Sequence, residues 1–135
     1  MQITRAYGPS RLAPADWFAG TVWMDEIASP PAPSRIHAIL VTFAPGARTA
    51  WHTHPLGQTL RVTQGQGLAQ RRGAPPEVIR AGDTIWFAPG EEHWHGADAD
   101  HVMTHLAIHE HADDGIATHW LLHVTDDEYA ATPHA

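Results

Sequence analysis

The sequence predicts an all-β domain of the barrel or sandwich type, and three observations support this prediction. Glycine and proline, 11 of each in 135 residues, recur at short intervals and leave little room for long helices. Almost no window of helical length shows a 3.6-residue hydrophobic period. The segments between the glycines and prolines are rich in valine, isoleucine, threonine and aromatic residues, which favour extended strands. Short strands at such spacing are typical of two packed sheets or of a closed barrel.

Seven segments are expected to form strands. They are residues 20–27 (GTVWMDEI), 35–43 (RIHAILVTF), 58–64 (QTLRVTQ), 67–72 (GLAQRR), 76–80 (PEVIR), 83–88 (DTIWFA) and 101–110 (HVMTHLAIHE). The Pro-Gly pair at 45–46 predicts a type II turn, and Gly65 with Gly67 offers the positive φ that a hairpin needs. Further turns at 82–83 and 89–90 bound the 83–88 strand. We therefore expect two successive hairpin units of one sheet system.

One domain is expected over residues 1–135, because a chain of this length can bury a core without dividing. Residues 1–34 should contribute an N-terminal strand and a rigid, proline-rich connector, residues 35–124 the barrel, and residues 125–135 a C-terminal tail. The tail carries a helix-start signal, Thr125 followed by three acids, which predicts one short helical turn on the surface.

Composition excludes several classes of protein. The formal charge of −7 argues against a nucleic-acid partner, whose phosphates require a basic surface. The longest apolar runs fall short of the roughly 20 residues that span a bilayer, and the N-terminus does not resemble a signal peptide, so we expect no membrane association and a cytoplasmic location. The chain has no cysteine and no lysine, which excludes thiolate ligands and lysine Schiff bases. Any metal must be held by nitrogen and oxygen.

Histidine is the outlying residue type, with twelve copies, and two of its His-x-His pairs each follow a Pro-Gly turn. Side chains alternate along a strand, so His52 and His54 point the same way, as do His93 and His95. Gln58 can return to the face of the first pair after the intervening turn. If both pairs face the inside of one barrel, three or four imidazoles and an amide oxygen converge, which is a donor set for a borderline divalent cation. Two pairs, each after a Pro-Gly turn, are much harder to explain by chance than one.

Other histidines and two tryptophans can be placed by the same alternation. His105 and His109 share one face of the 101–110 strand, and if that face looks inward both are candidate general bases, because imidazole titrates near neutral pH. His37 is either another inward residue or a partly exposed one at a strand end. Trp51 and Trp94 fall out of the metal-facing alternation, so we expect them to pack between the barrel layers.

Two stretches resemble the sequence motifs of the cupin superfamily. Residues 46–65 (GARTAWHTHPLGQTLRVTQG) resemble the first motif, in which a glycine, five residues, His-x-His, three residues, a glutamate position, six residues and a glycine follow one another. Residues 82–95 (GDTIWFAPGEEHWH) resemble the second, in which Pro-Gly precedes the last histidine ligand. The resemblance implies a single-domain cupin fold, a double-stranded β-helix or jelly-roll barrel. The metal ligands that it implies are His52, His54, Gln58 and His93.

Gln58 stands where most cupins have glutamate. A neutral amide would leave the bound ion its full charge and make it a stronger Lewis acid than a carboxylate ligand would. The alternative is that Gln58 only hydrogen-bonds a strand edge.

A narrower resemblance covers most of the chain from Pro14 onward. The stretches ADWFAGTV, GARTAWHTHPLGQTL, GDTIWFAPGEEHWHGA, MTHLAI and HVTDDEY together resemble the small bacterial manganese-dependent cupins with (R)-selective hydroxynitrile lyase activity. This resemblance implies Mn²⁺ as the cofactor, with Thr49, His95 and His105 lining the pocket. Nitrogen-rich ligation by itself would equally suit Fe²⁺, Zn²⁺ or Ni²⁺. At His109 the family more often has a residue that does not titrate, so both His105 and His109 stay open as the base.

Two of the pocket residues also have a structural interpretation. The Thr49 hydroxyl either contacts substrate or stabilises a turn. His95 either takes part in the reaction or orients a metal ligand.

The expected function is the reversible cleavage of an aromatic cyanohydrin, such as (R)-mandelonitrile, to an aldehyde and HCN. The ion would polarise oxygen or receive cyanide, His105 or His109 would remove the hydroxyl proton, and His95 would assist. The alternatives are a metal-dependent dioxygenase and a non-enzymatic cupin that binds a small ligand or metal. The expected partner is a small-molecule substrate, and the expected assembly is a homodimer or homotetramer paired through the strand at 21–27.

Overall fold

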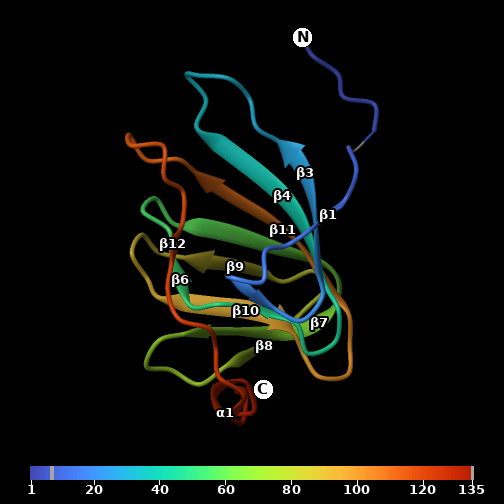
Figure 1. Ribbon diagram of the computed structural model, residues 1–135, viewed down its shortest axis with the longest axis vertical. Helices are drawn as coiled ribbons and strands as arrows, with labels where there is room; N and C mark the ends of the chain where they lie inside the picture. The colour runs from blue at the N-terminus through green and yellow to red at the C-terminus, as the bar shows by residue number, and fades with distance from the viewer. Residues whose placement is uncertain (7, 135) are drawn as a thin grey trace.

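The computed structural model describes residues 1–6 and 8–134 and confirms the all-β prediction (Figure 1). The strands are β1 (Arg11–Leu12), β2 (Phe18–Ala19), β3 (Val22–Ala28), β4 (Ile36–Phe43), β5 (Arg48–Thr49), β6 (His52–Thr53), β7 (Gln58–Arg71), β8 (Glu77–Arg80), β9 (Thr84–Phe87), β10 (His93–Ala97), β11 (Met103–Glu110) and β12 (His119–Trp120). One short helix, α1 (Asp126–Tyr129), follows near the C-terminus. Within residues 1–6 and 8–134, no helix is long and apolar enough to cross a membrane.

The strands form two antiparallel layers that share the long strand β7. In one layer the order is β1-β3-β4-β11-β7, with β9 on the other side of the first half of β7. In the other layer the second half of β7 lies between β8 and β10. On its other side β10 pairs with β5 and with β6, and these two short strands pair in turn with β2 and β12, respectively. The hydrophobic core contains fully buried side chains from both layers, among them Phe43 and Met103 of the first layer and Ala97 of the second. Inward-facing residues of β4, β6, β10 and β11 are thereby brought together.

The predicted hairpin at Gly65 and Gly67 is wrong, because β7 runs without interruption from Gln58 to Arg71. Both glycines allow a close approach between strands instead of a chain reversal. Gly65 has φ +78°, and a Cβ atom there would lie 1.8 Å from the Val102 carbonyl oxygen. A Cβ atom at Gly67 would lie 2.1 Å from the carbonyl oxygen of a β10 residue. The glycines therefore let one strand pass from the first layer to the second.

The second predicted hairpin unit, at 82–95, is also wrong. The strands β8, β9 and β10 follow one another in sequence, but each pairs with β7 and not with its neighbour in the chain. The turns at 82–83 and 89–90 exist, yet they carry the chain from one layer to the other. This alternation between layers is what brings β10 beside β6, where the two histidine pairs meet.

Trp51 and Trp94 are buried as expected but do not lie between the layers. They form a second cluster with Leu68 and Val124, against which Tyr129 packs. Since His93 and His95 face the core, Trp94 between them points to the opposite face of β10, where the C-terminal segment covers it. The helix start predicted at Thr125 is confirmed, because Thr125 caps α1 in a capping box with Glu128.

Candidate functional site

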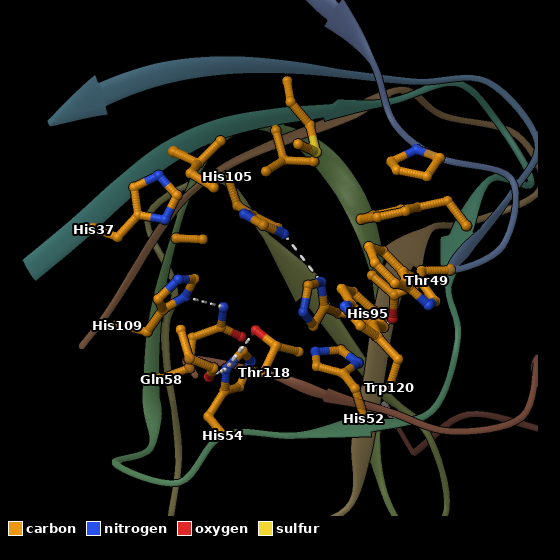
Figure 2. Close-up of a pocket in the computed structure, with 18 residues that line it drawn as sticks. His37, Thr49, His52, His54, Gln58, His95, His105, His109, Thr118 and Trp120 are labelled. Atoms are coloured by element: carbon orange, nitrogen blue, oxygen red, sulfur yellow. Dashed lines mark hydrogen bonds between the residues drawn. The ribbon is translucent and has the colours of Figure 1, made fainter. Parts of the chain in front are cut away.

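A cavity of about 250 Å³ lies between the layers and is lined by two kinds of side chain (Figure 2). The polar lining residues are His37, Thr49, His52, His54, Gln58, His95, His105, His109 and Thr118. The larger apolar ones are Trp17, Phe18, Met24, Ile39, Val41 and Trp120. Figure 2 shows Gln58 and His109 on one side of the cavity and His95 and Thr49 on the other.

The two His-x-His pairs converge as the sequence predicts. His52 of β6 and His93 of β10 are directly opposite each other in the antiparallel register, and their ring centroids are 4.3 Å apart. The ring of His54 lies 5.0 Å from that of His52 and 5.4 Å from that of His93. Gln58 opens β7 nearby, and Phe87 stacks on His93 with 3.6 Å between ring centroids. Four predicted ligands thus come from three adjacent segments.

The three predicted histidine ligands are held in the same tautomer by backbone carbonyl groups. Their Nδ1 atoms bond to the carbonyl oxygens of Ala50 (His52, 2.8 Å), Ala117 (His54, 2.8 Å) and Glu91 (His93, 2.7 Å). A carbonyl oxygen only accepts, so Nδ1 carries the proton in each ring and Nε2 keeps its lone pair. The Nε2 atoms of His54 and His93 are buried and have no hydrogen-bond partner.

Gln58 adds an oxygen to these nitrogen atoms. Its amide nitrogen lies 3.3 Å from Nδ1 of His109 and, because an amide nitrogen only donates, the imidazole nitrogen accepts in this arrangement. The Oε1 atom is then left buried without a partner. Several buried acceptors facing one place without donors are costly unless something satisfies them. A divalent cation would do so, and the donor set therefore fits a metal ion.

A second grouping overlaps with this set. The nitrogen atoms of His52, His93 and His95 all lie within 4.8 Å of one another, and this buried triad could hold a metal ion. His52 and His93 belong to both groupings, which differ in whether His54 with Gln58 or His95 completes the site. His95 differs from the others because its Nδ1 is bonded to another imidazole and not to the backbone.

That imidazole is His105 of β11, whose Nε2 lies 3.0 Å from Nδ1 of His95. One of the two nitrogens donates, so the pair shares a single proton along this bond. The outer atoms, Nε2 of His95 and Nδ1 of His105, are buried without a partner. Thr49 supports the pair from β5, because its hydroxyl oxygen accepts a hydrogen bond from the His95 backbone amide at 3.2 Å. The sequence left two roles open for Thr49, substrate contact and structural support, and this hydrogen bond is of the structural kind.

Burial keeps the imidazoles of the site neutral. Desolvation lowers the pKa of His93 from 6.5 to about 3, that of His105 to about 4 and that of His109 to about 3. The pKa values of His52 and His95 are also lowered well below 6.5, first by desolvation and then by neighbouring histidines. At neutral pH these rings are therefore unprotonated and can offer lone pairs to a cation or to a hydrogen-bond donor. None of the described residues that line the cavity is Asp, Glu, Lys or Arg.

His37 combines its two predicted places, because it lines the cavity and is only half-buried near the start of β4. Its ring lies 5.3 Å from that of His109 and 5.9 Å from that of His111. Burial lowers its pKa, so it too is a neutral polar residue at neutral pH.

One wall of the cavity was not expected from the sequence. Trp120 of β12 stacks on Trp17 with ring centroids 5.3 Å apart and an interplanar angle of 4°, and it lies 4.7 Å from the ring of His52. Thr118 places its hydroxyl 3.3 Å from Nδ1 of His54. Residues 117–120 are too few to show a strand-like alternation, so the sequence gives no clear signal that they form a wall of the cavity. The mixture of polar and apolar side chains around Trp120 is the one sequence feature that points to this segment.

Comparison with known proteins adds four findings. The sequence profile of the Cupin domain matches residues 39–109. An (R)-mandelonitrile lyase of Granulicella tundricola is 59% identical over 116 residues, which cover 86% of this chain and 88% of that protein. A cupin-like protein from Thermotoga maritima, a solved structure, superposes with a TM-score of 0.83 and 35% identity over 95% of both chains. A polyketide cyclase from Streptomyces resistomycificus shares the fold, with a TM-score of 0.73 and 14% identity over 96% of this chain and 89% of that one.

Proposed function

The chain belongs to the cupin family, and from this premise we propose that it is a metal-dependent hydroxynitrile lyase. The reaction is the reversible cleavage of aromatic cyanohydrins such as (R)-mandelonitrile to an aldehyde and HCN. One observation carries the proposal: a cavity brings unpartnered Nε2 and Oε1 acceptors next to a buried imidazole pair able to move a proton. The identity with a protein named (R)-mandelonitrile lyase supports the choice of substrate.

In this proposal His52, His54, Gln58 and His93 hold the metal ion. The backbone-bonded tautomers favour this set over the triad with His95, because each of the three rings already presents Nε2. When bound, the ion would supply Lewis-acid stabilisation of negative charge on the substrate oxygen. We propose Mn²⁺ from the resemblance to the manganese cupins; Fe²⁺, Zn²⁺ and Ni²⁺ are the alternatives that elemental analysis would distinguish.

The His95–His105 pair carries the proton. Cleavage needs a base for the hydroxyl proton, the electron pair of the C–CN bond leaves with cyanide, and the oxygen forms the carbonyl group. Proton uptake at Nε2 of His95 is balanced by transfer of the proton on Nδ1 towards His105, and the reverse transfer delivers a proton to cyanide as HCN. His109 is less suited as the base, because its Nδ1 already accepts a hydrogen bond from Gln58.

The test uses purified protein whose metal content is measured by elemental analysis. Racemic mandelonitrile is added at mildly acidic pH, where spontaneous breakdown is slow, and benzaldehyde release and the remaining enantiomer are followed. We expect metal-dependent consumption of the (R) form that His52→Ala abolishes and that His101→Ala, a change at an exposed histidine, leaves intact. No release from fully manganese-loaded protein would refute the proposal, and oxygen consumption by iron-loaded protein would favour a dioxygenase.

The proposal also includes the setting in which the enzyme works. We take it to act on a small molecule, without nucleic acid or membrane, as a homodimer or homotetramer in the cytoplasm. Light scattering of the purified protein checks the assembly, and cell fractionation checks the location.

A further inference from the structure

We propose that the cavity also binds small aryl carboxylates, such as 2-hydroxy-2-arylacetates, as ligands that compete with the cyanohydrin. The inference rests on the proposed function, because it requires the cation that His52, His54, Gln58 and His93 would hold. The inference goes beyond the proposed function because these ligands are anions, whereas the proposed substrate is uncharged.

The argument begins with the charge of the site. Four neutral donors would hold a doubly charged cation, and none of the described residues lining the cavity is an acid. The imidazoles cannot compensate the charge either, because an imidazole ring is either neutral or positively charged. An uncompensated charge in a buried site is unfavourable, so the cation increases the affinity of the cavity for an anion from solution.

Gln58 is the residue that leaves this charge uncompensated. It is 4% exposed, its Oε1 has no partner, and its N–H is engaged by His109. A glutamate at this position would place a carboxylate among the same donors and supply the missing negative charge. The side chain at position 58 therefore decides whether the site needs an external anion.

The rest of the cavity selects what the anion is attached to. The stacked Trp17 and Trp120 provide a flat apolar wall, and Phe18 lies 5.5 Å from Trp120 by ring centroids. The cavity volume of about 250 Å³ is below the roughly 300–1,000 Å³ of sites for drug-sized ligands, so it suits a molecule with one ring. The His95–His105 pair has a donor at one outer nitrogen and an acceptor at the other, and a hydroxyl group next to the carboxylate can bond to either kind of atom.

The test compares two ligands of nearly the same shape, (R)-mandelate and its neutral amide (R)-mandelamide. Binding to manganese-loaded protein is measured by titration calorimetry and by the relaxation of water protons around Mn²⁺, so neither readout depends on turnover. We expect mandelate to bind about tenfold or more tightly than mandelamide, because one ligand carries the compensating charge. Gln58→Glu should abolish this preference, and Gln64→Glu, which adds the same charge at an exposed position of β7, should keep it.

Equal affinities for the two ligands, or a preference that survives Gln58→Glu, would overturn the inference. If Gln58→Glu does not fold, the metal-free natural protein replaces it: there the mandelate preference must disappear, and its persistence would equally overturn the inference. Benzaldehyde release is measured on the same samples. Manganese-loaded protein that prefers mandelate but releases no benzaldehyde would refute the lyase activity alone, whereas turnover without the preference would refute only the anion ligand.

Discussion

Replacing His105 by glutamine separates proton transfer from structure at the buried imidazole pair. His105 is fully buried, and its Nε2 lies 3.0 Å from Nδ1 of His95. Glutamine keeps a donor and an acceptor for that bond but cannot take up a proton near neutral pH. We therefore expect kcat to fall by about 10²- to 10⁴-fold, the usual contribution of a positioned acid or base. Stability should change little, whereas His105→Leu should cost about 1–3 kcal/mol because it leaves a buried polar atom of His95 unpartnered.

The assay measures kcat and KM for (R)-mandelonitrile with the metal content of each protein set equal, together with the thermal midpoint. His101→Gln, the same change at an exposed histidine, is the control. A His105→Gln protein that folds, holds its metal and keeps kcat within about threefold of the natural protein would refute the reasoning. The proton would then have to pass through His109, and His109→Gln would become the decisive variant.

Three further predictions concern pH, the aromatic wall and the shared strand. The folded pKa of His105, about 4, lies below its ordinary value of 6.5, so the unfolded chain binds more protons between these values. The free energy of unfolding of metal-free protein should therefore fall as pH drops from about 6.5 towards 4, by up to about 1.4 kcal/mol per pH unit for each such histidine. Urea unfolding curves that do not move with pH would contradict this prediction. Trp120→Ala should raise KM for mandelonitrile several-fold, whereas Trp86→Ala, at a tryptophan that does not line the cavity, should leave KM unchanged. Equal KM values for the two variants would show that the aromatic wall does not contribute to substrate binding. Gly67→Ala should lower the free energy of unfolding by about 1–3 kcal/mol, because its Cβ would overlap a β10 carbonyl group. In thermal denaturation the control Gly8→Ala, whose Cβ would meet nothing within 4 Å, should not change the midpoint. Equal midpoints for the two variants would contradict the close approach of β7 and β10.

Much of the fold was predictable because strand-forming patterns are local. The hairpins at Gly65 and at 82–95 were not, since a positive-φ glycine serves equally well in a turn and in a strand that crosses between layers. What decides between them is the distant contact of Gly65 with Val102 and of Gly67 with β10. The burial of Trp51 and Trp94 could be predicted from their large apolar side chains, but the face of the sheet on which they are buried depends on where the C-terminal segment docks.

The candidate site divides in a similar way. Alternation within a strand predicts that each His-x-His pair shares a face, and the structure brings both pairs together. The bond between His95 and His105 joins β10 and β11, which lie on different halves of β7, and no spacing in the sequence encodes that distance. The wall formed by Trp120 was missed because a two-residue strand has no measurable period.

The bonds from His52, His54 and His93 to backbone carbonyl oxygens have a consequence for how this protein can change. The accepting atoms belong to the main chain at Ala50, Glu91 and Ala117, and every amino acid, proline included, supplies such an oxygen. Mutation at these three positions therefore leaves the acceptors in place as long as the backbone keeps its path. Directed evolution can diversify the aromatic wall and the His95–His105 pair to seek new chemistry, while the orientation of the three imidazoles is inherited with the fold.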